Sequence, residues 1–148
     1  MVEDEMDFSC AHDEAYKERD PAKVAEDLGL NLVESASDLL LCDLDTPESV
    51  KVFWDRFGDL EEIPDLIKGK PLLTISKSGK KHGYVRLARE LNELERIGLQ
   101  AVLGSDTKRE ALSVQRSIGK TRDGASVLFE TDEEINRVRA FIRPATDF

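Results

Sequence analysis

The chain has 148 residues, of which 40% are hydrophobic and 35% charged, and its formal net charge is −10. This composition predicts one globular, soluble domain, and no stretch approaches the roughly 20 apolar residues that a membrane helix needs. The acidic N-terminus is unlike a secretory signal. Cys10 and Cys42 lack a metal-binding spacing. Because Cys42 lies within a predicted core strand, we expect no structural disulfide and a reducing compartment. We expect an acidic, flexible segment over residues 1–9 and a single cytoplasmic domain over residues 10–148.

The charge is distributed unevenly along the chain. Residues 1–66 carry 5 Lys or Arg and 20 Asp or Glu, a net charge of −15, whereas residues 67–148 carry 16 and 11, a net charge of +5. Within this second part, residues 68–122 carry 13 basic and 5 acidic residues, a net charge of +8. Because a local basic field can dock a polyanion, the overall acidity does not exclude a nucleic-acid partner. A solubilising acidic segment beside an ordinary mixed surface explains the same numbers.

Capping residues, glycines and hydrophobic periodicity predict the secondary structure. Asp20 and Thr46 each precede a proline, as at a helix start, and Gly29 and Gly58 are natural helix ends. Thr131 with Glu134 forms a capping pair for the last helix. In chain order we expect helices over 11–19 and 21–28, a strand over 38–45, a helix over 47–58, strands over 72–76 and 82–88, helices over 92–103 and 106–117, a strand over 125–129 and a final helix from 131.

Without its N-terminal helices, the predicted chain has the order βαββαβ. This order is that of a split βαβ, or RRM-like, sheet in an α+β fold, and we expect the helices to pack on one face of the sheet. In that arrangement the strands over 38–45 and 82–88 are antiparallel neighbours. Asp43, Asp45 and His82 are then expected to meet at one edge of the sheet.

Two carboxylates follow an apolar run in the sequence Leu-Leu-Leu-Cys-Asp-Leu-Asp. Side chains alternate along a strand, so Asp43 and Asp45 point to the same face. Paired carboxylates repel each other, and a divalent cation commonly relieves this repulsion. The pattern therefore predicts a seat for Mg²⁺ or Mn²⁺, although many strands end in acidic turns without binding a metal.

A basic turn lies between the two middle strands, in the sequence Ser-Lys-Ser-Gly-Lys-Lys-His that ends at His82. Glycine allows backbone N–H groups to approach a phosphate, and lysines supply positive charge. The predicted phosphate-binding residues are Ser78, Lys80, Lys81 and His82. The Walker A spacing is absent, and the same residues are typical of an ordinary solvated hairpin turn.

Three motifs resemble those of the archaeo-eukaryotic primase superfamily, the DNA primase/polymerase fold. Leu39–Asp45 resembles its motif one, Ser78–His82 with the following Tyr-Val-Arg-Leu resembles motif two, and Val127–Glu130 resembles motif three. The segment over 99–116, which includes Leu-Gly-Ser-Asp, is similar to short stand-alone primase-like proteins of bacterial viruses. The resemblance covers about residues 38–131.

The resemblance implies divalent-metal-dependent nucleotidyl transfer from nucleoside triphosphates on single-stranded DNA, in DNA replication and, for a viral protein, in the host cytoplasm. On that pattern Asp43, Asp45 and Glu130 hold the metal, and His82 with Ser78 contacts the nucleotide phosphates. A non-catalytic module that binds nucleotide or single-stranded nucleic acid, with a replication protein as partner, is the alternative. A metal-dependent nuclease that uses the same acids is a third reading.

The third acid stays open among Glu130, Asp123 and Asp106. A plain split βαβ sheet would place Glu130 at the far end, and Asp106 also suits the N-cap of a helix. Arg109 and Arg116 lie seven residues apart on one predicted helix, hence on one face. They are candidates for contact with template or triphosphate oxygens, and surface arginines without a ligand are equally consistent with the spacing.

Overall fold

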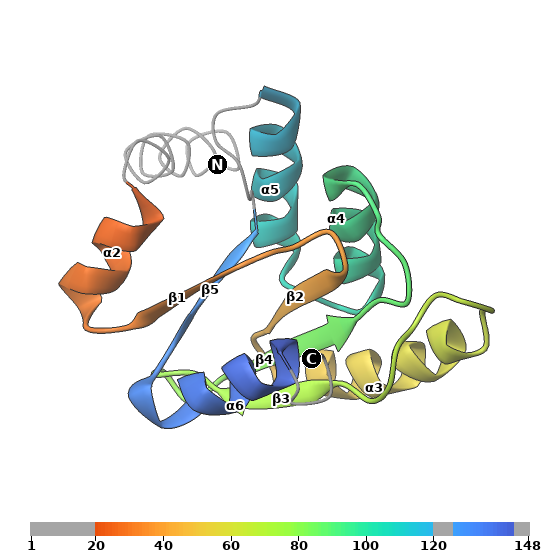
Figure 1. Ribbon diagram of the computed structural model, residues 1–148, viewed down its shortest axis with the longest axis horizontal. Helices are drawn as coiled ribbons and strands as arrows, with labels where there is room; N and C mark the ends of the chain where they lie inside the picture. Colours follow the sequence, from red (N-terminus) through yellow and green to blue (C-terminus); the bar gives the residue numbers. More distant parts are fainter. Residues whose placement is uncertain (1–19, 120–125, 144–148) are drawn as a thin grey trace, which may run out of the picture.

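The central sheet of the computed structural model, which describes residues 20–119 and 126–143, has three antiparallel strands (Figure 1). Its order is β2 (Leu39–Leu44), β4 (Lys81–Arg86) and β3 (Leu72–Ile75). All three strands were predicted from the sequence, with ends that differ by one or two residues. The expected antiparallel pairing of the acidic strand with the histidine strand is confirmed.

A second sheet contains only two strands, β1 (Asn31–Glu34) and β5 (Val127–Glu130), which pair antiparallel. The sequence predicted β5 but not β1. Because β5 pairs with β1, it does not extend the ladder of the three-stranded sheet, and the predicted RRM-like topology is not confirmed. The fold is a mixed α+β fold.

In the part of the chain that the structure describes, five helices accompany the two sheets, and most begin at the caps that the sequence predicts. The Asp20 side chain accepts a hydrogen bond at the start of α2, and Thr46 and Asn92 form capping boxes for α3 and α4. Thr131 makes no such side-chain bond, so its predicted capping pair with Glu134 is wrong. The helices are α2 (Pro21–Leu28), α3 (Pro47–Glu61), α4 (Glu93–Val102), α5 (Thr107–Gly119) and α6 (Asp132–Ile142).

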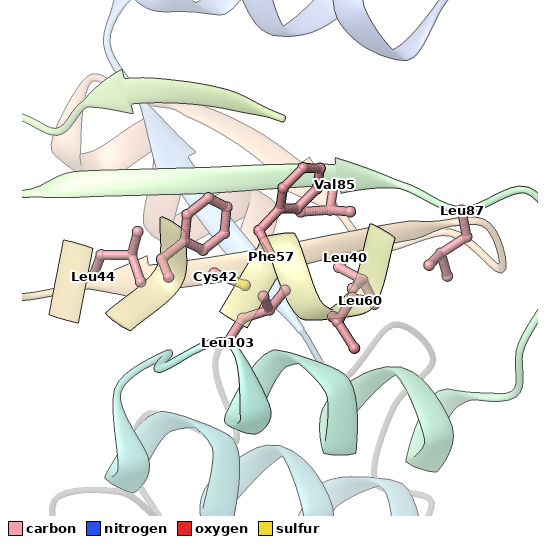
Figure 2. Packing of buried hydrophobic residues seen from close by; sticks show 9 residues of the cluster. Leu40, Cys42, Leu44, Phe57, Leu60, Val85, Leu87 and Leu103 are labelled. Carbon is pink, nitrogen blue, oxygen red and sulfur yellow. The ribbon is translucent and has the colours of Figure 1, made fainter. Parts of the chain in front are cut away.

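One hydrophobic cluster fills the space between the sheet and α3 (Figure 2). Alternate side chains of β2, namely Leu40, Cys42 and Leu44, meet Phe53 and Phe57 of this helix. Both rings are buried, whereas Trp54 of the same helix is half exposed. The helix runs three residues past Gly58, its predicted end, because Leu60 also packs into this cluster.

A second cluster covers the opposite face of the sheet. Leu39 and Leu41 of β2 and Tyr84 of β4 pack against side chains of β1, β5 and α6. The expectation that helices lie on one face only is therefore wrong: α3 covers one face, while α6 and the two-stranded sheet cover the other. Figure 1 shows α6 beside β3, and α4 and α5 next to each other near β2.

The remaining expectations concern the N-terminal segments and the possibility of a membrane-spanning helix. The predicted helix over 11–19 and the acidic segment over 1–9 lie outside the described residues. Within the described ranges, no helix combines the length and apolar character that crossing a bilayer requires.

Candidate functional site

Asp43 and His82 are direct cross-strand partners in the β2–β4 ladder. They lie on the same face as Leu41 and Tyr84, beyond the end of the apolar cluster on that face. His82 Nε2 is 3.9 Å from Asp43 Oδ1, and both side chains line a cavity. The predicted meeting of the acidic pair and the histidine is confirmed.

Asp45 completes the acidic pair at the end of β2. Its Oδ1 atom lies 3.9 Å from Lys80 Nζ of the basic turn. Partial burial and the neighbouring Asp43 carboxylate raise the pKa of Asp45 to about 6, with a smaller contribution from Asp106 and an opposing one from Lys80. The two carboxylates and the basic turn therefore share one electrostatic environment.

The loop between α4 and α5 fixes the backbone of Asp43. The Asp43 amide donates to Ser105 Oγ at 2.8 Å, and the Asp43 carbonyl accepts from the Asp106 amide at 2.8 Å. Gly104 adopts a φ of 87°, which favours glycine, so the chain turns sharply into this contact. The Leu-Gly-Ser-Asp segment is thus a clamp on the edge of β2 that faces away from β4.

A buried polar network supports this clamp, and the sequence did not reveal it. Glu110, which is 3% exposed, accepts from Ser105 Oγ at 2.6 Å and from Gln100 Nε2 at 2.9 Å. The side-chain Oε1 atom of Gln100 in turn accepts from the Leu41 amide at 2.9 Å. Burial raises the pKa of Glu110, and Arg109 and the hydrogen bonds of Ser105 and Gln100 oppose this effect.

Arg109 and Arg116 both line the cavity, which agrees with the prediction that they lie on one face of the same helix. The Arg109 guanidinium donates to the Leu41 carbonyl at 3.0 Å and to the Val127 carbonyl at 3.1 Å, so it joins α5 to β2 and β5. It also pairs with Glu110. Arg116 is 6% exposed. Neither arginine is a solvated surface side chain, and Arg109 has a clear structural role.

The basic turn between β3 and β4 forms one rim of the cavity. It closes through a bond of 2.7 Å from the Ser76 amide to the Lys80 carbonyl, and Gly79 has a φ of 90°. Ser76, Lys77, Ser78 and Lys80 line the cavity, but Lys81 does not. Lys81 opens β4 on the strand face opposite to His82, which explains the difference.

The cavity has a volume of about 790 Å³ and is bounded by the end of β2, the basic turn, α5 and β5. It is lined by charged and polar side chains at one end and by an apolar wall that includes Leu30, Leu112 and Phe129. Such a combination of a few polar groups with an apolar wall is typical of small-molecule sites. Of the predicted site residues, it brings together Asp43, Asp45, Ser78, Lys80, His82 and Arg116.

Glu130 lies beneath His82 and does not line the cavity. Its Oε2 atom accepts from Thr74 Oγ1 at 2.8 Å and from the Tyr84 hydroxyl, and it lies 2.8 Å from His82 Nδ1. The carboxylate is fully buried, and its Oε1 atom has no hydrogen-bond partner in the described part of the chain. Glu130 is therefore near the histidine and not at the far end of the sheet, because its strand pairs with β1.

The other two candidates for the third acid differ in what the structure describes. Asp106 caps α5, since its Oδ2 atom accepts from the Arg109 amide at 3.0 Å, and its charge acts on Asp45. Asp123 lies outside the described residues. Over residues 20–119 and 126–143, no group of three or more His, Cys, Asp or Glu side chains has the arrangement of a metal site.

Comparisons with known proteins return no relative for this chain: no family model, curated protein or solved structure matches it.

Proposed function

We propose that this protein is a primase/polymerase-like nucleotidyltransferase that uses a nucleoside triphosphate and single-stranded DNA. The observation that carries the proposal is the convergence of the Asp43/Asp45 pair, His82 and the basic turn in one cavity of about 790 Å³. The motif resemblance to the archaeo-eukaryotic primases supports the same chemistry. In this proposal β2, β4 and β3 correspond to the core of the RRM-like sheet of that family.

The donor chemistry of the site fits Mg²⁺ or Mn²⁺. Asp43 and Asp45 offer adjacent carboxylates, and burial together with the neighbouring Asp43 carboxylate raises the pKa of Asp45. Both metals accept two carboxylates and complete their coordination with water and substrate phosphate. When bound, such an ion supplies charge neutralisation at the triphosphate.

The remaining residues would hold the nucleotide. Lys77 and Lys80 place positive charge on the rim, and the Ser78 hydroxyl can donate to a phosphate oxygen. His82 lines the same cavity, and its Nε2 atom lies beside Asp43. The apolar wall formed by Leu112 and Phe129 suits the face of a base or sugar. Arg116 lies on the α5 side, where a further phosphate could pair with it.

A binding module without turnover is the second candidate. The observation that favours it is the engagement of Glu130 with His82, Thr74 and Tyr84, which leaves two strand carboxylates and the capping residue Asp106 near the proposed metal. Such a module would bind nucleotide or single-stranded nucleic acid and serve replication through a partner protein.

Primer synthesis and nucleotide binding separate the two candidates. The protein is incubated with Mn²⁺, labelled nucleotides and a single-stranded template, and Asp43→Asn/Asp45→Asn is compared with the wild type. The matched control is Asp55→Asn/Asp59→Asn, which removes two exposed carboxylates of α3 far from the cavity lining.

A product that disappears only in the site variant supports nucleotidyl transfer. ATP binding without product supports the binding module, and degradation of the DNA supports a nuclease. If ATP affinity is the same in the wild type, in the site variant and in His82→Ala, the proposed site is wrong.

A further inference from the structure

Glu130 contacts His82 on the side that faces away from the cavity. The distance from His82 Nδ1 to Glu130 Oε2 is 2.8 Å, and His82 Nε2 lies on the cavity side, 3.9 Å from Asp43 Oδ1. The 3.9 Å separation exceeds hydrogen-bond distance, so Asp43 does not occupy Nε2. One ring nitrogen is thus held by a buried carboxylate, and the other makes no hydrogen bond within residues 20–119 and 126–143.

The hydrogen bonds around Glu130 determine which nitrogen carries the proton. Its Oε2 atom accepts from the hydroxyl groups of Thr74 and Tyr84, so this oxygen acts as an acceptor. A hydrogen bond from His82 to the same oxygen therefore requires a proton on Nδ1. Thr74 is the ladder partner of His82, so hydroxyl groups from two adjacent strands hold the Glu130 carboxylate in place.

We propose that Glu130 is a positioning residue that keeps the proton of His82 on Nδ1 and holds Nε2 toward the cavity in which the nucleotide would bind. The proposal rests on the proposed nucleotide site and replaces the expected role of Glu130 as a metal ligand. A carboxylate behind a functional histidine sets its tautomer and orientation, as second-shell partners do for metal-bound histidines.

The tautomer can be measured without any ligand. Long-range ¹H–¹⁵N correlation spectra of the wild type at pH 8 report which nitrogen of His82 is protonated, and His12 is identified by a His12→Gln variant. We expect the Nδ1–H form in the wild type. The same form is expected in Tyr84→Phe, which removes one donor to Glu130 Oε2 but keeps the histidine contact. An Nε2–H form in the wild type would overturn the proposal.

Two substitutions of Glu130 separate positioning from metal binding. Glu130→Gln keeps a side-chain oxygen that accepts from Nδ1, whereas Glu130→Leu removes the acceptor. We expect the Nδ1–H form and ATP affinity with Mg²⁺ to be retained in Glu130→Gln, and ATP affinity to fall about tenfold in Glu130→Leu. Loss of Mg²⁺ binding in Glu130→Gln with an unchanged tautomer would instead identify a metal ligand and overturn the proposal.

Coupling between the two residues completes the test. If Glu130 acts through His82, Glu130→Leu/His82→Gln should bind ATP no more weakly than His82→Gln alone, whereas additive losses would overturn the proposal. Should Glu130→Leu fail to fold, the wild-type tautomer and Glu130→Gln still decide the question. An Nδ1–H tautomer in a wild-type protein that binds no ATP would support the positioning of His82 and refute the nucleotide site.

Discussion

Asp43 and His82 face each other across two antiparallel strands, with His82 Nε2 3.9 Å from Asp43 Oδ1. This pair marks the point where one face of the sheet changes from apolar to polar. Leu39, Leu41 and Tyr84 on that face are buried, whereas Asp43 and His82 reach the cavity. The site is therefore an extension of the core face, and the strand register that orders the core also orders the site.

The adjacent lysines of the basic turn provide a matched comparison. Lys80 lines the cavity and Lys81 does not, although the sequence predicted both as phosphate ligands. We expect Lys80→Ala to weaken ATP binding about three- to fivefold, the order of an exposed ion pair, and Lys81→Ala to have little effect. Isothermal titration at two salt concentrations measures both effects, and the loss in Lys80→Ala should shrink at high salt. Equal losses of ATP affinity in the two variants would contradict the assignment of Lys80, but not Lys81, to the rim of the cavity.

Asp45 should make stability depend on pH in the absence of metal. Its pKa is raised to about 6 in the folded protein by burial and by Asp43, so the folded state binds a proton more tightly than the unfolded state. The contribution of Asp45 to stability is therefore present below about pH 4 and is lost as pH rises through about 6. Asp45→Asn removes this dependence.

Chemical unfolding in EDTA between pH 4 and 7 measures the effect. The free energy of unfolding of Asp45→Asn, relative to that of the wild type, should increase as pH rises and become constant above about pH 7. EDTA is needed because a bound cation would stabilise the charged pair. A difference that stays constant over this range would show that the pKa of Asp45 is not raised in the folded protein.

The sequence was sufficient to predict the acidic strand beside the histidine strand, because both are apolar runs with clear ends and their pairing follows from the element order. It was not sufficient for β1. Of its four residues only Val33 is buried, so neither an apolar run nor a clear alternation marks the strand. Missing β1 also led to the expected position of Glu130 in a single four-stranded sheet.

The polar network behind the site could not be read from the sequence for a different reason. Ser105, Glu110 and Gln100 come from a loop and two helices, and each residue type is common on a solvated surface. Their burial depends on the way α4 and α5 pack against β2, which is a tertiary property. In the sequence, the only distinguishing feature of the Leu-Gly-Ser-Asp segment as a whole is its resemblance to viral primase-like proteins.

Ser105 should therefore contribute more to stability than an ordinary loop serine. Its hydroxyl accepts from the Asp43 amide and donates to the buried Glu110 carboxylate. We expect Ser105→Ala to lower the free energy of unfolding by about 1–3 kcal/mol, the cost of leaving buried polar partners unsatisfied. Ser78→Ala, at an exposed position of the basic turn, is the matched control and should change stability by less than about 0.5 kcal/mol. Similar values for the two variants would show that the clamp on β2 is not formed.

Replacing glycine by alanine should raise the free energy of unfolding where an added Cβ atom has space and lower it where the Cβ atom would crowd a neighbour. Gly58 and Gly98 lie within α3 and α4, and a Cβ atom at either position would meet no neighbour within 4 Å. Because alanine is the better helix former, each substitution should raise the free energy of unfolding by about 0.5–1 kcal/mol.

Gly83 is the contrasting case. It lies in β4, where an added Cβ atom would be 3.0 Å from Phe53 Cε1 and 3.4 Å from Leu44 Cδ1. Gly83→Ala should lower the free energy of unfolding by about 1–3 kcal/mol, because the Phe53 ring is fully buried and has little room to shift. Denaturant titration of the three variants checks the order. Since Gly83 is the neighbour of His82 in β4, a stable Gly83→Ala protein would mean that α3 packs less closely under the site than the structure shows.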